Sequence, residues 1–304
     1  MIPTKSQVHV DKILTNIAIA YRNKKYIWRE LAPVIPVKFE SDKYYTFPKA
    51  RWFTNEAALR APGTRARLSG FSISTDSYNA DEFALATKIA DRVLKNTDSP
   101  LTLRTAKASY VADKVDMARD IELAALVNVT GTWGTDKTLT NTWDAAVSTP
   151  IEDIIEAQDT VATATGEELN MGALGREVWS QLRRHPDILD ILSAVERQIA
   201  TPQLLAQAFD IEKIVIGRSI KNTANPAQTA AMSQIWGKHA FFAYITPTPG
   251  IMTPTALYTF MSRDARVRTW YDEPEEATYI ESGNVLDFKV VAADVGYYID
   301  AAVA

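Results

Sequence analysis

Apolar residues at helical spacing, followed by two prolines, define the first segment of the chain. From Val10 to Tyr21 the apolar positions recur with the period of a helix, which predicts a short amphipathic helix over residues 8 to 21. Pro33 and Pro36 then interrupt regular structure. Residues 31 to 39 are expected to run extended, because the residue before a proline avoids the helical region. The first 40 residues are therefore predicted to form an arm with little core of its own.

Two strand-like segments follow this arm. Residues 43 to 53 are rich in aromatic side chains, and residues 67 to 75 alternate, with Phe71 and Ile73 on one face. Pro48 confines the first strand to an edge or a free-standing ribbon, because proline removes a ladder donor. A two-stranded ribbon is marginal alone in water. We therefore expect the ribbon to rest on another surface, for which a neighbouring subunit is the natural candidate.

The clearest helical pattern runs from residue 98 to residue 129. Asp98 or Ser99 can cap its start, Pro100 suits the first helical position, and no glycine or proline follows until Gly131. About 30 residues at 1.5 Å each give a helix of roughly 45 Å, far longer than usual, which is expected to serve as the spine of an extended part. Its apolar face is predicted to comprise Leu101, Val111, Val115, Ala118, Ile121 and Leu126.

The second half of the chain mixes helices with strands. The Gly- and Thr-rich residues 131 to 149 predict a loop or a domain boundary. Continuous apolar runs predict strands that are covered on both faces, whereas alternating runs near the end predict an antiparallel meander with one covered face. The fold class is thus α+β. The predicted helices begin at Pro150 and cover 174–182 and 186–194, the buried strands 213–220 and 240–245, and the meander 257–261, 265–271, 277–281 and 286–293 with turns at 272–276 and 282–284.

Composition narrows the class of protein. The 304 residues are 46% hydrophobic and 23% charged, which is ordinary for a globular protein of one large domain or two. The absence of cysteine excludes disulfides, thiolate zinc sites and cysteine nucleophiles. The amino-terminal segment lacks the pattern of a secretory signal, and no apolar run approaches the roughly 20 residues of a membrane span. We expect a protein that is made in a cytoplasm and has no membrane partner.

The charge is distributed unevenly along the chain. Residues 1 to 67 contain 13 Lys or Arg against 5 Asp or Glu, whereas the formal net charge of the whole chain is -4. This imbalance is either a solvated surface, or a basic part that lies across an acidic region of a neighbouring copy or faces nucleic acid. Around the ribbon, the basic residues could contact single strands through charge and stacking, or grip an acidic protein surface. We favour the protein surface, because the ribbon needs support. The residues are Lys49, Arg51, Arg60, Arg65 and Arg67, interleaved with Trp52 and Phe53.

Motifs that carry chemistry are missing from the sequence. It contains neither a phosphate-binding loop nor a GxSxG nucleophile elbow, and His9, His185 and His239 share no metal-ligand spacing. His185, at a predicted helix end, and Gly217, after a strand, are expected to have structural roles in dipole compensation and in a turn or close packing. We predict no catalytic, metal or cofactor-binding residue. A hydrolase with a distributed site stays open as an alternative, because triad residues can be far apart in sequence.

The order of these elements and several stretches of sequence resemble one family. The segments are AYRNKKYIWRELAPVIPV from Ala20 to Val37, IVIGRSIKNTAN at 214–225, IWGKHAFFAY from Ile235 to Tyr244, and FKVVAADVGYYIDAAV from Phe288 to Val303. Together they resemble the major capsid proteins of tailed bacteriophages, which have the Hong Kong ninety-seven fold. The resemblance implies an arm at 1–40, an extended β-ribbon loop at 41–80, a peripheral domain at 81–140 and 255–304 with a spine helix and a meander, and an axial domain at 141–254.

The resemblance also implies a function and its partners. Copies would assemble into pentamers and hexamers of an icosahedral shell that encloses double-stranded DNA in a virion, built in the host bacterial cytoplasm. Separate scaffold, portal and decoration proteins are candidate partners, and DNA would be contacted without sequence preference. Alternatives are a nanocompartment shell with a protein cargo, the hydrolase above, and a monomeric nucleic-acid-binding module. The predicted intersubunit contacts are Lys24, Lys25, Trp28, Lys49, Arg51, Arg60, Arg65 and Arg67.

Overall fold

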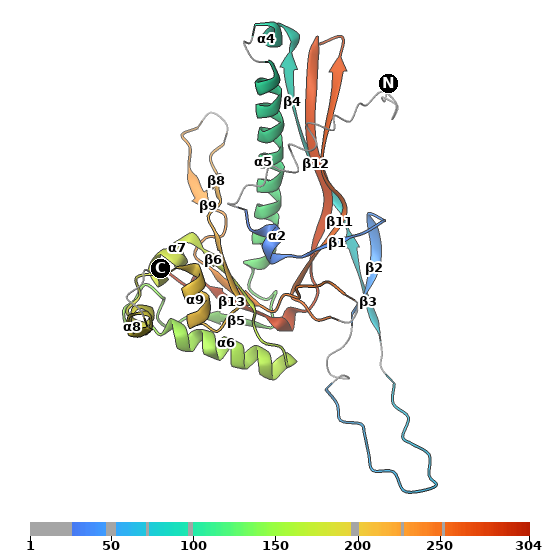
Figure 1. The fold of residues 1–304 in the computed structure, drawn as a ribbon, viewed down its shortest axis with the longest axis vertical. Coiled ribbons are helices and arrows are strands. Elements are labelled where there is room, and N and C mark those ends of the chain that lie inside the picture. Colours follow the sequence, from blue (N-terminus) through green and yellow to red (C-terminus); the bar gives the residue numbers. More distant parts are fainter. Residues whose placement is uncertain are drawn as a thin grey trace.

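The computed structural model describes residues 26–46, 53–70, 73–96, 100–195, 201–225, 228–250 and 253–304. The helix expected at residues 8 to 21 lies outside the described residues. Figure 1 shows an elongated part built along one long helix, a compact mixed part at the lower end of this helix, and a long loop that projects away from both. Both termini of the described chain lie away from the tip of that loop.

The long helix α5, Pro100–Val127, confirms the predicted spine. Its buried stripe confirms the predicted one at Val111 and Val115 and differs after them: positions 119, 123 and 127 are buried, whereas Ala118, Ile121 and Leu126 are half-buried. The stripe was misjudged because Arg119 interrupts its apolar character. The amino-terminal half of α5 packs on the elongated sheet through Ala108 and Ala112, and its carboxyl-terminal half packs on the junction with the compact part.

The elongated sheet contains four strands in the order β1-β11-β12-β4. The prediction of a four-stranded meander at 257–293 was wrong, because the chain there forms two long antiparallel strands with register shifts between Met261 and Arg266. The turn predicted at 282–284 is instead the middle of a strand, where Ser282 and Asn284 are buried. The turn at 272–276 is confirmed in position. The strands are β1 Val34–Pro36, β11 Leu257–Asp272, β12 Ala277–Val290 and β4 Asp81–Ala90.

More of the amino-terminal segment is buried in the subunit core than predicted. Helix α2, Trp28–Leu31, is buried against α5, and β1 then pairs in parallel with β11. The prediction of an arm with little core up to residue 40 was therefore wrong for residues 27 to 32. Four apolar side chains in six residues are enough to anchor the segment, and Ile27, Trp28, Leu31 and Ala32 are each at most 3% exposed.

The compact part is a five-stranded sheet in the order β5-β13-β10-β6-β7 with helices packed against it. Predicted helices at 150 and 186 are confirmed, but the helix expected at 174–182 begins as a strand and becomes helical at Arg176. Helix α9 was not predicted. Strand β5 was not predicted either, because it lies in the segment expected to be a loop. The elements are β5 Thr135–Thr138, α6 Pro150–Thr165, β6 Met171–Gly175, α7 Arg176–Leu182, α8 Pro186–Val195, α9 Pro202–Ala208, β7 Lys213–Gly217, β10 Ala240–Ala243, the 3-10 turn Ala293–Val295 and β13 Gly296–Asp300.

The final strand of the chain does not pair with β11 and β12, the strands that directly precede it in sequence. The final strand β13 leaves the elongated part and pairs with β10 and β5 in the centre of the compact sheet. Its residues Tyr297 and Ile299 enter the core of the compact part, while Tyr298 joins the core at the junction with α5. The carboxyl terminus thus ties the two parts together, which short-range patterns could not reveal.

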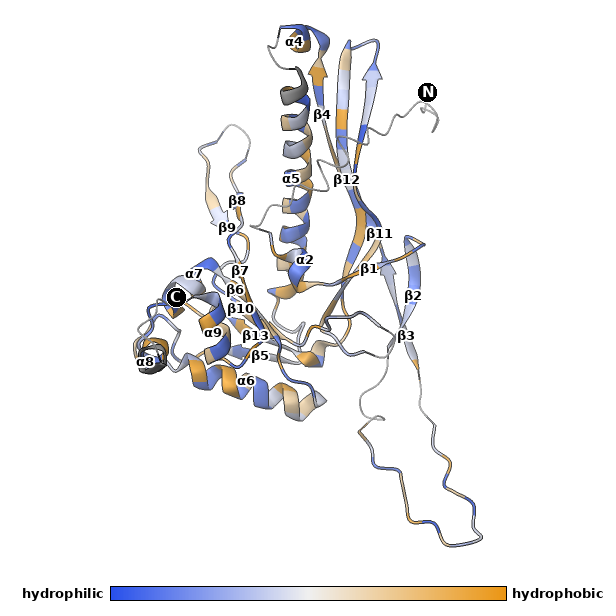
Figure 2. Cartoon of the chain, in the orientation of Figure 1, coloured by the Kyte–Doolittle hydropathy of each residue, from blue (hydrophilic) through white to orange (hydrophobic). Residues whose placement is uncertain are grey.

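Two ribbons stand apart from these sheets (Figure 1). In the first, β2 Ser41–Thr46 pairs with β3 Ser74–Asn79, so the predicted second strand was placed too early, overlapping the observed one only at residues 74 and 75. The ribbon rests on the elongated sheet where Tyr78 stacks on Phe260 with ring centroids 4.5 Å apart. The second is a short hairpin formed by β8, Ile220–Asn222, and β9, Met232–Gln234. Figure 2 shows hydrophobic and hydrophilic residues interspersed along α5 and α6.

Candidate assembly surfaces

The long loop between β2 and β3 offers apolar surface that the rest of the chain does not cover. Nearly all side chains of residues 53 to 70 are exposed, and Leu59 and Leu68 are 104% and 96% exposed. Hydrogen bonds of Thr64 to Ala61 and of Ser69 to Glu56 stay within the loop itself. A leucine kept in water forgoes about 1.5–3 kcal/mol of burial energy. The loop therefore has contact surface to offer to a second molecule.

Three of the predicted contact residues lie together on this loop. Arg60, Arg65 and Arg67 are exposed, and none of them forms an ion pair with a described residue. Uncompensated guanidinium groups can bind carboxylates with two parallel hydrogen bonds. Four other predicted residues, Lys24, Lys25, Lys49 and Arg51, lie outside the described residues.

Trp28 does not fit its predicted role. Its side chain is 1% exposed and packs edge-on against Phe288, with ring centroids 5.8 Å apart. The Arg29 guanidinium lies over the indole at 4.2 Å from the ring centroid. Because the subunit's own core fills the space around this ring, the prediction of Trp28 as an intersubunit contact is wrong.

The junction of the arm, the spine and the compact part is held by one buried carboxylate. Asp120 of α5 accepts hydrogen bonds from the Ile27 backbone N–H at 3.0 Å, from Ser219 Oγ at 2.5 Å and from Trp236 Nε1 at 3.1 Å. Burial raises the pKa of Asp120, and these hydrogen bonds oppose that shift. One side chain thereby joins three segments that are distant in sequence.

The neighbouring Arg119 joins α5 to two strands of the elongated sheet. Its fully buried guanidinium donates to Asn284 Oδ1 at 2.9 Å and to the Asp81 carbonyl at 2.8 Å. It also pairs with Glu122 at 2.6 Å and lies 4.0 Å from the centroid of the Phe83 ring. Sequence reasoning missed both Arg119 and Asp120. The available signal was a charged residue at position 119 in the stripe that otherwise contains Val111, Val115, Leu123 and Val127.

A serine and a histidine meet inside the compact part, but their geometry does not activate a nucleophile. Ser148 Oγ lies 2.9 Å from His185 Nε2, and both residues are buried. His185 Nδ1 accepts the Asp187 backbone N–H, and Nε2 also contacts the Ala145 carbonyl, which can only accept. These contacts assign the proton to Nε2, so that nitrogen has no lone pair with which to take a proton from Ser148.

Metal-binding clusters and long apolar helices are absent from the described segments. These segments contain no group of three His, Cys, Asp or Glu side chains arranged to hold a metal ion. Among their helices, none is long and apolar enough to cross a membrane.

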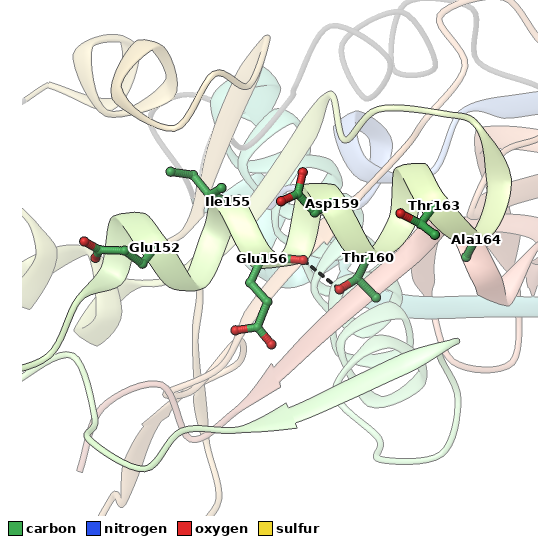
Figure 3. Close-up of a pocket in the computed structure, with 7 residues that line it drawn as sticks. All are labelled: Glu152, Ile155, Glu156, Asp159, Thr160, Thr163 and Ala164. Atoms are coloured by element: carbon green, nitrogen blue, oxygen red, sulfur yellow. Dashed lines mark hydrogen bonds between the residues drawn. The ribbon is translucent and has the colours of Figure 1, made fainter.

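A shallow groove follows the outer side of α6 (Figure 3). It is lined by Glu152, Ile155, Glu156, Asp159, Thr160, Thr163 and Ala164. The close-up shows that the lining side chains, three of them acidic, all project from a single helix. Lys137 of β5 pairs with Glu156 at 2.6 Å at the edge of this surface. Such a surface lacks the converging polar groups of a catalytic pocket and has the shape of a contact surface.

Comparison with known proteins agrees with a shell subunit. A major capsid protein of Pseudomonas phage JBD67 is 25% identical over 305 residues, covering 97% of this chain and 97% of the relative. A major capsid protein of Burkholderia phage BcepMu is 26% identical over 301 residues, covering 95% of each chain. No family model matches the chain.

Solved structures share the same fold. The crystal structure of a phage-related protein from Bordetella bronchiseptica superposes with a TM-score of 0.78 at 22% identity, covering 97% of this chain and 98% of that one. The capsid of cyanophage P-SCSP1u gives a TM-score of 0.62 at 14% identity, covering 93% and 90%. The fold is thus that of a shell-forming capsid protein. Within this class, the chain resembles the major capsid proteins of tailed bacteriophages along nearly its whole length, as predicted from its sequence.

Proposed function

We propose that the chain is the structural subunit of a phage capsid. Its copies assemble into pentamers and hexamers, and these form an icosahedral shell around double-stranded DNA. The role is structural, and its partners are further copies of the chain, the packaged DNA and, where the phage encodes them, scaffold, portal and decoration proteins. The virion is then the place where the protein acts, after assembly in the bacterial cytoplasm.

The observation that carries this proposal is the exposed loop at residues 53 to 70. It combines the almost fully exposed Leu59 and Leu68 with three arginines that form no ion pair with a described residue. A soluble monomer gains nothing from such a projection, whereas a subunit that lies across its neighbour buries it. We assign residues 41–80 to the extended loop, and the parts built around α5 and around β10 to the peripheral and axial domains, with β5 and β13 added to the axial sheet.

Electron microscopy of the expressed protein tests the proposal. The chain should form closed or tubular shells, either alone or when expressed with the genes that flank it. A compact monomer under both conditions, in sedimentation as well as in micrographs, would contradict a capsid function.

The contents of purified shells distinguish the capsid from a nanocompartment. Shells from infected cells should contain nuclease-protected double-stranded DNA of uniform length. A stoichiometric protein cargo without DNA would instead support the nanocompartment. Hydrolase activity that persists in a monomer would support the hydrolase alternative.

A further inference from the structure

The outer face of α6 combines an exposed apolar residue with acidic residues, as one side of a protein–protein interface does. Its inner face is buried through residues such as Ile154, Ala157 and Val161, while Ile155, in the middle of the outer groove, is 50% exposed. Glu152 and Asp159 flank Ile155 and form no ion pair with a described residue, whereas Glu156 is held by Lys137 at 2.6 Å. Residues 150 to 168 contain no Lys or Arg but six acidic residues, which are Glu152, Asp153, Glu156, Asp159, Glu167 and Glu168.

The β8–β9 hairpin has the complementary composition. Ile220 is paired with Gln234 and Asn222 with Met232, so Ile220 and Met232 share one face of the ribbon, where they are 43% and 59% exposed. Arg218 is exposed just before β8 and forms no ion pair with a described residue. From residue 213 to residue 262 the chain contains no Asp or Glu, and its basic residues are Lys213, Arg218, Lys221 and Lys238.

These two surfaces cannot meet within one copy. Figure 1 shows α6 along the lower edge of the compact part and the β8–β9 hairpin projecting from its upper edge, beside α5. A symmetric dimer through either surface would place like charges together, which disfavours it. Opposite edges of opposite charge favour head-to-tail contact, and head-to-tail contacts close into a ring when the rotation between copies allows it.

We propose that the α6 groove of one copy binds the β8–β9 hairpin of the next copy around a capsomer. Ile155 then contacts the apolar face of Ile220 and Met232, and Glu152 and Asp159 face Arg218 at the rim. Lys221 lies on the opposite face of the ribbon and adds positive charge beside this contact. An apolar centre with a charged rim is the usual anatomy of such an interface. This inference rests on the capsid function proposed above and adds the pair of surfaces that closes the ring.

Cross-linking tests the contact directly, because the chain has no cysteine of its own. The double variant Asp159→Cys/Met232→Cys, treated with a short bis-maleimide, should give a ladder of covalent oligomers that ends at pentamers and hexamers. The matched control Glu168→Cys/Met232→Cys keeps one cysteine and moves the other out of the groove, and should give at least tenfold less product. If shells form but the first variant gives no more ladder than the control, the inference is wrong while the capsid function stands.

Charge exchange provides a second test. Glu152→Lys/Asp159→Lys and Arg218→Glu/Lys221→Glu should each lower shell yield about tenfold through like-charge contacts. Combining all four substitutions in one chain should restore shells, because the signs again match. Failure of the combined variant, with both pairs folded by circular dichroism, would overturn the inference. If the unmodified chain forms no shells, the capsid function itself fails.

Mixing the two pair variants predicts a more specific outcome. In a mixed ring, every α6 groove meets a hairpin of opposite charge only when the two variants alternate. Strict alternation is possible around six positions but not around five. The mixture should therefore yield hexamers in sheets or open tubes without pentamers. Closed shells with pentamers at wild-type yield would contradict the proposed pairing.

Discussion

Arg119 and Asp120 are adjacent on α5 and face different parts of the molecule. The guanidinium of Arg119 reaches the strands of the elongated sheet, and the carboxylate of Asp120 reaches the arm and the segment after β7. A buried charge is tolerated only when its partners surround it, because the cost of desolvation is large. The fold at this junction is therefore specified by individual side chains as well as by apolar area.

Substitution of Arg119 should be among the most damaging changes in the chain. Arg119→Ala removes the partner of Asn284 Oδ1 and of the Asp81 carbonyl, and we expect the free energy of unfolding to fall by about 3–5 kcal/mol. Urea denaturation of the unassembled subunit measures this. Lys88→Ala removes an exposed ion pair with Glu275 on the same sheet and should change stability little. Equal effects of the two substitutions would contradict the role assigned to Arg119.

Asp116, one turn before Asp120, should make subunit stability depend on pH. Burial raises its pKa from 3.8 to about 6, with nearby Asp264, Asp113 and Asp120 adding to the shift and Arg29 opposing it. Between these pH values the folded subunit holds a proton that the unfolded chain has released, so stability falls as pH rises through this window. Asp116→Asn should remove most of that slope and stabilise the subunit at neutral pH by on the order of 1–3 kcal/mol. Thermal unfolding from pH 4 to pH 7 would show this, and an unchanged slope would contradict it.

The positions of helices and strands in this chain depend on close packing between side chains and backbone as much as on helix and strand propensity. The predicted structural role of Gly217, a turn or close packing, is explained by Trp236, whose ring lies where a side chain would begin: a Cβ at position 217 would stand 2.3 Å from it. The same indole donates to Asp120, so the strand end, the tryptophan and the spine helix form one packed unit.

Gly217→Ala should therefore destabilise the compact part. The added methyl group must displace the buried Trp236, and we expect a loss of about 1–3 kcal/mol, measured by denaturation and by a change in tryptophan fluorescence. Gly70→Ala is the matched control, since a Cβ at position 70 meets nothing within 4 Å. A Gly217 variant as stable as the Gly70 variant would show that the indole can move without cost.

At the scale of the whole molecule, the extended loop and the compact part lie on different sides of the lower end of the elongated part (Figure 1). The loop contributes exposed apolar and basic surface, and α6 contributes acidic surface. Because these surfaces point in different directions, they cannot cover one another within one copy. The molecule is in this sense one unit of a larger structure, and its assembly should depend on charge.

Reversal of the loop arginines should separate assembly from folding. Arg60→Glu/Arg65→Glu/Arg67→Glu changes three exposed side chains, so the subunit should keep its unfolding temperature while shell formation falls at least tenfold. The control Arg60→Lys/Arg65→Lys/Arg67→Lys keeps the charge and should retain most of the assembly. Sedimentation velocity and micrographs report both outcomes. Normal shells from the glutamate variant would remove this loop from the contact.

Local patterns determined the elements whose periodicity is long and uninterrupted. The spine helix, the helices that begin at Pro150 and Pro186, and the strands at 213 and 240 follow from the spacing of apolar residues and from proline at a helix start. The order of elements also carried the resemblance to phage capsid proteins. These features depend on neighbours within a few residues, which is why the sequence alone was sufficient.

Tertiary structure decided the features that depend on partners far along the chain. Strand β12 continues through Gly283 and Asn284 because β4 and Arg119 supply their partners, and a short alternating pattern cannot show this. Trp28 is buried because Phe288 and α5 surround it, although its own segment resembles an exposed arm. The acidic side of α6 and the basic hairpin are far apart in sequence, and only the fold places them on opposite sides of the compact part.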